Sequence, residues 1–227
     1  MSKTRLIDAV RKLEFSVAKE ILRSEVSKAF VVDRAGRNLL HLTCSASCPS
    51  LGLPESAGVQ LARLLLDYGV DFESTLVLDA YPCNSVWFAV AKGRNTALVK
   101  FLLSRGASPR GLFAAGWHED LAVIRLLLRA GASVDEVAED ETPFLHCWKT
   151  QRFRPSWLLL RSGADPNFQD SAGCTALHYG VQKSFAPSLL RQLVRAGASP
   201  NVKDRRGISA SDLASRKRDP AYRAALT

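Results

Sequence analysis

His41, Cys44 and Cys48 lie together within residues 41–48, close enough in the chain to share a metal ion. Imidazole nitrogens and thiolates are ligands that Zn²⁺ prefers, and a structural zinc site usually needs four of them. The sequence offers no fourth ligand at a recognisable zinc spacing from this group. We therefore expect no metal site here, and no other pattern in the chain indicates a cofactor.

The other nucleophilic and titratable residues form no catalytic pattern either. The chain has five cysteines and four histidines, and of the histidines only His118 is expected to be free of a structural role. There is no Gly-rich phosphate loop, no nucleophile elbow and no paired-acid signature. We therefore expect a protein without enzymatic activity.

The composition is that of an ordinary globular protein, with 47% hydrophobic and 23% charged residues. An odd number of widely spaced cysteines argues against a disulfide framework and favours a reducing compartment. No stretch reaches the roughly 18 apolar residues that a membrane-spanning helix needs. The first residues lack the apolar core of a signal peptide. We expect a cytoplasmic protein that does not engage a membrane, with export by a signal-independent route as the alternative.

The formal charge of +9 is unevenly distributed along the chain. Residues 151–227 contain 13 Lys and Arg against 5 Asp and Glu, whereas residues 1–150 contain 18 against 17. The positive excess of the C-terminal third therefore predicts an acidic partner, either a protein surface or a nucleic acid.

A run of leucines followed by Gly and a small residue recurs along the chain. The glycines that close these runs are Gly69, Gly106, Gly131, Gly163 and Gly197. Their spacings of 37, 25, 32 and 34 residues scatter around 33. A second motif, clearest as Thr175-Ala-Leu-His178, precedes most of these glycines by 21 or 22 residues. Both halves fit a short helix capped by Thr or Ser, followed by a Leu-rich helix that ends at a left-handed Gly.

These linked motifs resemble the ankyrin repeat, which has a period of about 33 residues and a Thr-Pro-Leu-His signature. The resemblance covers nearly the whole chain. It implies an all-α solenoid of about six to seven helix pairs, with an irregular first repeat and a charged C-terminal cap. It also implies that His41 and His178 hydrogen-bond loop backbone between repeats. We expect a single domain over residues 1–227, with repeats at roughly 1–32, 33–71, 72–108, 109–134, 135–166, 167–199 and 200–227.

Three departures from the repeat length stand out. Residues 45–56 form an insertion of about ten residues, which we expect to be a loop between the two helices of the second repeat. The hairpin before Ser85 is about four residues too long, and the one between Gly106 and Arg110 about eight too short. The fourth repeat should therefore keep its two helices and lose its hairpin. Because partners of ankyrin repeats usually lie across the hairpins and inner helices, this gap is a candidate binding place.

Large side chains occupy variable or normally small positions close to this gap in the repeat pattern. The predicted partner-binding residues are Trp117, His118, Trp148, Lys149, Arg152, Tyr179, Gln182 and Lys183. Trp and Arg are the residue types most often energetic at interfaces. The alternative for Trp148, which replaces the small alanine of the family, is that it fills a packing gap left by the irregular fourth repeat.

We therefore predict a monomeric, non-enzymatic module that binds a partner protein with an acidic surface on its concave face, as an adaptor, an inhibitor or antidote, or an effector. The alternative is binding of nucleic acid or another polyanion through the basic C-terminal third. That charge comes from Arg191, Arg195, Lys203, Arg205, Arg206, Arg216, Lys217 and Arg218. The chain has no aromatic-interleaved base-reading motif, so nucleic acid is the less favoured partner. Leu126 and Leu159, both in Leu runs, are predicted to lie in the core.

Overall fold

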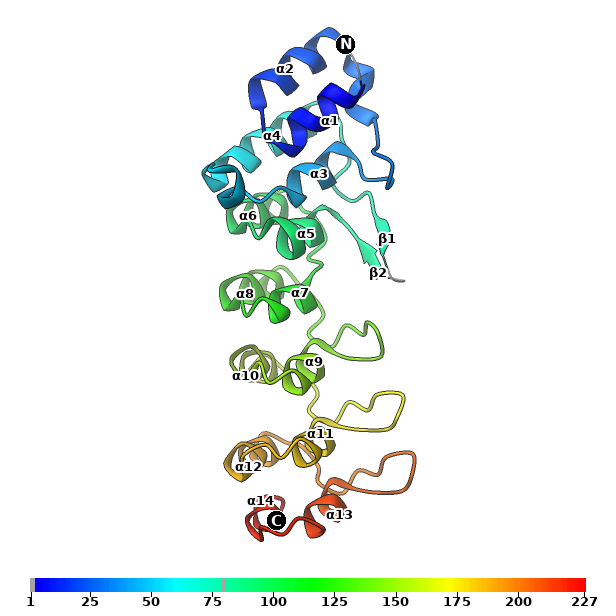
Figure 1. Cartoon of the computed structure of the whole chain (residues 1–227), viewed down its shortest axis with the longest axis vertical. Helices are drawn as coiled ribbons and strands as arrows, with labels where there is room; N and C mark the ends of the chain where they lie inside the picture. The colour runs from blue at the N-terminus through cyan, green and yellow to red at the C-terminus, as the bar shows by residue number, and fades with distance from the viewer. Residues whose placement is uncertain (1–2, 79–80) are drawn as a thin grey trace. The chain divides into compact units, whose positions relative to one another are not determined.

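Pairs of short helices joined by turns and hairpins recur along the chain in the computed structural model, which describes residues 3–78 and 81–227 (Figure 1). The chain divides into two units. Unit 1 holds residues 1–118 and 122–132, and unit 2 holds residues 119–121 and 133–227. The described residues form seven helix pairs, in agreement with the predicted all-α architecture.

Unit 1 contains four helix pairs and one short sheet. Its elements are α1 (Lys3–Arg11), α2 (Phe15–Ser24), η1 (Val26–Phe30), α3 (Leu39–Ser45), η2 (Pro49–Leu51), α4 (Glu55–Asp67), β1 (Leu76–Leu78), β2 (Tyr81–Cys83), α5 (Ser85–Phe88), η3 (Ala89–Gly93), α6 (Thr96–Ser104), α7 (Leu112–Trp117) and α8 (Leu121–Arg129), whose first residue groups with unit 2. The first helices of successive pairs stack on one another, α1 on α3 and α3 on α5, while α4 packs on α6.

Unit 2 contains the last three pairs. Its helices are α9 (Pro143–Lys149), α10 (Phe153–Arg161), α11 (Ala176–Gln182), α12 (Pro187–Arg195), α13 (Ala210–Ser215) and α14 (Ala221–Ala225). The inner helices α9, α11 and α13 stack in this order, and the outer helices α10, α12 and α14 pack behind them. Helices this short are unstable alone in water, so stacking must supply most of their stability.

Side-chain caps and left-handed glycines set the helix ends at the predicted places. Thr142 Oγ1 accepts a hydrogen bond from the Leu145 amide at 3.2 Å and so caps α9, with Pro143 in the first turn. Thr175 and His178 form a reciprocal capping box at the start of α11. Gly163 ends the turn after α10 with a φ of 97°, a conformation that costs other residues energy.

The hairpins of three repeats turn on the same Asp-x-x-Gly sequence. The aspartates are Asp33, Asp170 and Asp204, and each accepts two backbone N–H bonds from residues two and four positions later. Gly36, Gly173 and Gly207 follow with positive φ. A short acceptor side chain and a glycine are the residues such a turn requires. The spacing of three is therefore a local signal for these hairpins.

The leucines of the second helices fill the core of each unit. Leu159 of α10 is fully buried, as predicted. The prediction for Leu126 is wrong by one position, because Leu126 is only half-buried while Ile124 and Leu127 are fully buried. In a run of three leucines on a helix, each step turns about 100°, so the buried face includes only part of the run.

The insertion of the second repeat is packed against the next repeat in unit 1. Residues 46–54 contain the short helix η2, and Cys48 beside it is fully buried. The side-chain amide of Asn95 donates to Cys48 Sγ at 3.3 Å and to the Glu55 carbonyl at 3.0 Å. Glu55 in turn accepts from the Ala97 amide at 2.8 Å. The predicted loop is present, and it is fastened to the start of α6.

The long hairpin of the third repeat adds a small sheet to the helical fold. Strands β1 and β2 pair antiparallel, with Leu76 opposite Cys83 and Leu78 opposite Tyr81. The two residues between the strands, 79 and 80, lie outside the described residues. The extra length predicted for this hairpin is thus used for main-chain pairing.

The fourth repeat has a short extended link, residues 107–111, in place of a hairpin. The backbone amide of Ser108 donates to Glu73 Oε1 at 2.6 Å, and the side-chain amide of Asn84 donates to the Ser108 carbonyl at 2.9 Å. These bonds hold the link against the preceding repeat within unit 1.

Candidate functional site

Trp117, the last residue of α7, is half exposed and is one of the few large apolar side chains on the surface of the described chain. Its helix follows Gly111, the N-cap residue, which has a φ of 108°. A Cβ at Gly111 would lie 3.3 Å from Val90 Cβ, so the backbone of α7 approaches η3 closely. The short link and this close approach therefore place Trp117 at the end of a firmly held helix.

His118 has a structural bond, which corrects the expectation that it would be free. Its Nε2 lies 3.2 Å from the carbonyl oxygen of Ala91, in the π-helical segment η3 of the preceding repeat. The ring is part-buried between the two repeats. His118 therefore supports the position of α7 and adds little accessible surface.

Trp87 and Lys92 form a further aromatic and basic pair in unit 1, and the repeat pattern did not single them out. Lys92 Nζ lies 5.8 Å from the centre of the Trp87 ring, a cation–π contact. Lys92 is exposed on η3, where the backbone widens to a π-turn that ends at a left-handed Arg94. Such turns are frequent at functional sites. The only sequence signal was a Trp in the degenerate motif Ser85-Val-Trp-Phe.

Trp148 cannot contact a partner, contrary to the prediction, because its side chain is fully buried in unit 2. Four aromatic rings surround it with centroid distances between 5.5 and 6.1 Å. These rings belong to Phe144, Phe153, Trp157 and Phe185. The gap-filling alternative therefore describes Trp148, as expected for a large apolar side chain whose N–H finds a partner.

Lys149 and Tyr179 are held in a polar network at the base of a hairpin in unit 2. Lys149 forms an ion pair with Glu141, and its Nζ lies 4.4 Å from the centre of the Tyr179 ring. The Tyr179 hydroxyl donates to Asp170. Burial and this hydrogen bond raise the pKa of Tyr179 well above its ordinary value. We predicted that Lys149 would offer its positive charge to an acidic partner. The ion pair with Glu141 neutralises most of that charge within the fold.

Glu141 is the acceptor at the centre of this network. His146 Nδ1 lies 2.8 Å from Glu141 Oε2, and Lys149 pairs with the other oxygen. Burial raises the pKa of Glu141, but the bonds to His146 and Lys149 outweigh it and the net direction is downward. The carboxylate therefore stays ionised and ties the hairpin to α9.

Gln182 and Lys183 remain exposed at the end of α11. Lys183 Nζ donates to the Lys149 carbonyl at 2.8 Å, so it also satisfies the C-terminal end of α9. Arg152 lies half-buried at the N-cap of α10. Within unit 2, Gln182 and Lys183 are therefore the most exposed of the predicted site residues.

The histidine and cysteine groups serve the fold. His41 Nε2 lies 2.8 Å from the Ser74 carbonyl and His178 Nε2 lies 3.1 Å from the Ile208 carbonyl, as the resemblance implied. All five cysteines are buried and unpaired in disulfides. Burial raises the pKa of Cys147 to about 12, so this thiol is a poor nucleophile. Over the described residues, no group of three His, Cys, Asp or Glu side chains is arranged to hold a metal.

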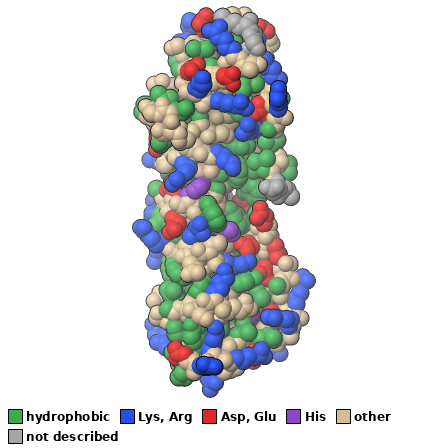
Figure 2. All heavy atoms as spheres, in the orientation of Figure 1, with side chains coloured by type: hydrophobic (Ala, Val, Ile, Leu, Met, Phe, Trp, Pro, Cys, Tyr) green, Lys and Arg blue, Asp and Glu red, His purple; other side chains and the backbone are tan. Residues whose placement is uncertain are grey.

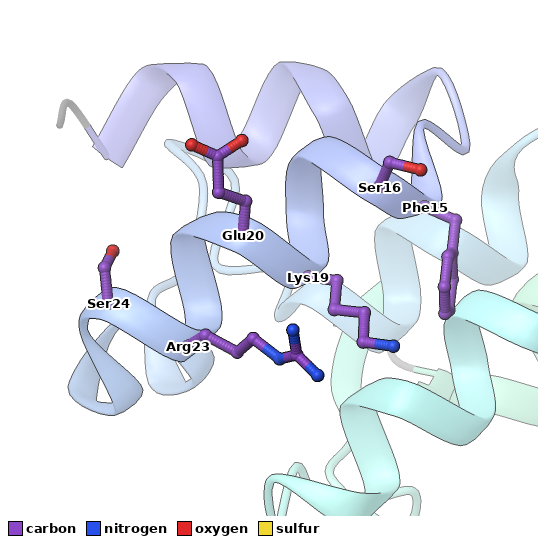
Figure 3. A pocket seen from close by; sticks show the side chains of 6 residues that line it. All are labelled: Phe15, Ser16, Lys19, Glu20, Arg23 and Ser24. Carbon is purple, nitrogen blue, oxygen red and sulfur yellow. The ribbon is translucent and has the colours of Figure 1, made fainter.

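A shallow hollow beside α2 has no catalytic arrangement. It is lined by Phe15, Ser16, Lys19, Glu20, Arg23 and Ser24. Figure 3 shows that all six side chains project from one helix. A hollow with a single wall offers a ligand few convergent polar groups.

Among the described residues, no helix has the length and apolar character to cross a bilayer.

Comparison with known proteins identifies the repeat. A family model described as ankyrin repeat matches residues 172–205, whereas no curated protein matches the sequence. The chain is similar to the solved ankyrin repeat domain of Bcl-3, a unique member of the IkappaB protein family. The identity is 21% and the TM-score 0.77, over 98% of this chain and 97% of that one. It is also similar to the human ASB11 ankyrin repeat domain, with 20% identity and a TM-score of 0.70, over 97% and 95% of the two chains.

The matched segment, residues 172–205, contains the capping box of α11, the Leu-rich α12 and the left-handed Gly197. The other helix pairs repeat this construction with the departures described above. The predicted ankyrin repeat is confirmed over residues 172–205, and the chain has the fold of solved ankyrin repeat domains.

Proposed function

We propose that this protein is a non-enzymatic binding module, and that the surface around Trp117 in unit 1 engages a partner protein. Ankyrin repeats are generally protein-interaction modules whose stacked helices present extended surfaces. The observation that carries the proposal is the half-exposed indole of Trp117 at the end of α7, in the repeat that lacks a hairpin. An exposed tryptophan on a rigid helix loses little entropy when a partner covers it.

The surroundings of Trp117 indicate the chemistry of the partner. Lys92 is exposed on η3, and the Ala91 carbonyl of the same segment holds the ring of His118. An apolar side chain of the partner would cover the indole, and an acidic rim would face Lys92. In unit 2, Gln182 and Lys183 offer a second, separate contact of the same polarity.

The experiment is affinity capture from extract of the source cells, followed by titration of the purified captured protein. Trp117→Ala should weaken binding by about 30-fold, equivalent to about 2 kcal/mol, because the anchor loses its buried area. Phe30→Ala is the matched control, since Phe30 is an exposed aromatic elsewhere in unit 1. It should leave the affinity unchanged.

The second measurement is the free energy of unfolding of each variant. It should change little for Trp117→Ala, because a half-exposed side chain contributes modestly to the core. If Trp117→Ala and Lys183→Glu both retain full affinity, the proposed site is wrong. The insertion at residues 45–56 would then be the next surface to test.

A further inference from the structure

The outer helices of unit 2 carry arginines and no acidic residues. The sequences of α10, α12 and α14 contain neither Asp, Glu nor Lys. Their arginines, which we name the outer arginine face, are Arg154, Arg161, Arg191, Arg195 and Arg223. All five are exposed. Arg161 and Arg195 occupy the last position of α10 and α12, and Arg191 lies one turn before Arg195.

Most acids of unit 2 lie in the hairpins, on the opposite side of the helix pairs. Five of the seven residues between positions 135 and 141 are acidic, and Asp170 and Asp204 lie in the next two hairpins. Figure 2 shows red side chains over the hairpin before α9, and blue side chains both along the side of the outer helices and over the lower hairpins. The outer helices therefore carry positive charge alone, whereas the hairpins of unit 2 carry both signs, with Lys203, Arg205 and Arg206 beside Asp204. The unmixed charge gives the outer side a positive potential.

The outer arginines keep their charge available. In the described part of the chain, Arg154, Arg161, Arg191 and Arg195 make no ion pair, and Arg223 bonds the Ser215 carbonyl at 3.3 Å. Other basic residues of the C-terminal third are engaged. Arg206 pairs with Asp204 at 2.8 Å, and Lys217 donates to Ser184 Oγ at 2.8 Å.

The apolar content of this face decides the class of partner. None of the large hydrophobic side chains exposed in the described residues lies on α10, α12 or α14. Protein interfaces bind through buried aromatic and aliphatic centres, and interfacial helices insert an apolar face into lipid. Neither feature is present here. Trp157, the tryptophan of α10, packs edge-on against Trp148 at 5.9 Å.

The side-chain chemistry fits phosphate. The planar guanidinium binds phosphate oxygens in pairs, and phosphate contacts alone supply sequence-independent affinity for nucleic acid. Single strands usually need exposed aromatic rings as stacking platforms, and this face has none among its fully exposed side chains. We propose that the outer arginine face binds the phosphate backbone of duplex nucleic acid without reading its sequence.

The test is fluorescence anisotropy of the full chain with labelled DNA and RNA duplexes of about 20 base pairs, between about 50 and 200 mM salt. Five phosphate contacts predict a slope of about −4 to −5 for log K against log salt. The triple variant Arg161→Glu, Arg191→Glu, Arg195→Glu should bind at least 10-fold more weakly and reduce the magnitude of the slope by about 3. Arg→Gln at the same positions should give the same direction with a smaller loss.

The charge-matched control is Lys12→Glu, Arg34→Glu, Lys100→Glu, three exposed basic residues of unit 1. It should retain most of the affinity, because the net charge changes equally while the outer arginine face is intact. Equal losses in both triple variants would overturn the proposal, as would binding to neither duplex at about 50 mM salt. Binding to vesicles with anionic lipid but to neither duplex would also overturn it and assign the face to a membrane surface. Folding of every variant is checked by circular dichroism.

Discussion

The indole N–H of Trp148 donates a hydrogen bond to the carbonyl oxygen of Ala176, 2.8 Å away. Trp148 belongs to α9 and Ala176 is the first residue of α11, so this bond joins two consecutive repeats. The tryptophan replaces the small residue that usually occupies this position, and α11 provides Gly180 next to it. A Cβ at Gly180 would lie 2.5 Å from Leu190 Cδ2 and 3.4 Å from Trp148 Nε1. The glycine therefore leaves room mainly for Leu190, and the indole packs beside it at ordinary contact distance.

Trp148→Ala should therefore reduce stability rather than partner binding. Removing a fully buried tryptophan leaves a cavity and costs about 3–5 kcal/mol of the free energy of unfolding. Trp148→Phe should cost less, because it keeps most of the volume and loses the bond to Ala176. Urea unfolding measures both. A loss below about 1 kcal/mol for Trp148→Ala would contradict the buried position.

Leu126, the first leucine of its run, and Leu159, the second of its run, should respond differently to truncation. Leu159→Ala is expected to cost about 2–5 kcal/mol, since Leu159 is fully buried. Leu126→Ala should cost clearly less, because Leu126 is half-buried, and Leu127→Ala should match Leu159→Ala. Thermal or urea unfolding of the three variants would show a wrong helix register if Leu126→Ala proved the most damaging.

Gly93 and Gly106 form a matched pair for testing how closely the repeats of unit 1 pack. A Cβ at Gly93 would overlap the carbonyl oxygen of Cys44, whereas a Cβ at Gly106 would meet nothing within 4 Å. Gly106 has a φ of 90°, so Gly106→Ala pays only backbone strain of about 1 kcal/mol. Gly93→Ala should cost about 3 kcal/mol or more, because backbone must move. Equal unfolding energies for the two variants would contradict this packing.

The sequence was sufficient to predict the repeat framework, because its determinants are local. Thr142 and Thr175 cap helices through their own backbone neighbours, and Gly163 and Gly197 end them through their own φ angles. Leu126 shows where local reasoning stopped. The Leu run determines that a face is buried, but neighbouring repeats decide which leucine lies at its centre.

The candidate site was harder to predict because it depends on contacts between repeats. Nothing in the motif around Trp148 shows that its indole N–H meets the Ala176 carbonyl of the next repeat. Lys149 is a surface charge by position, yet it pairs with Glu141 and lies over Tyr179. The exposure of Trp117 could be predicted from the sequence, because Trp117 is the last residue of its short helix. The charge excess was visible in the sequence, but its sorting onto the outer helices required the fold.

Asp33 should make stability depend on pH in the acid range. Its carboxylate accepts bonds from Arg11 Nη2 at 3.0 Å and Arg37 Nη2 at 2.8 Å, and from the amides of Ala35 and Arg37. Burial raises the pKa of Asp33, but the bonds from the Arg37 side chain and from the two amides outweigh it and lower the pKa from 3.8 to about 2. The side chain is only 4% exposed, so solvent screens these bonds little.

Because the folded-state pKa of Asp33 lies below its unfolded value, the stabilisation is complete above about pH 4 and is lost as the pH falls towards 2. The difference in pKa corresponds to about 2 kcal/mol of unfolding free energy. Asp33→Asn should be less stable at pH 7 and should remove this part of the acid dependence between pH 4 and 2. Asp8→Asn, at an exposed position of α1, is the control and should leave the curve as in the wild type. Urea unfolding at stepwise pH values measures the three curves. If the Asp33→Asn and wild-type curves run parallel through this range, the bonds from Arg11 and Arg37 do not hold the carboxylate ionised.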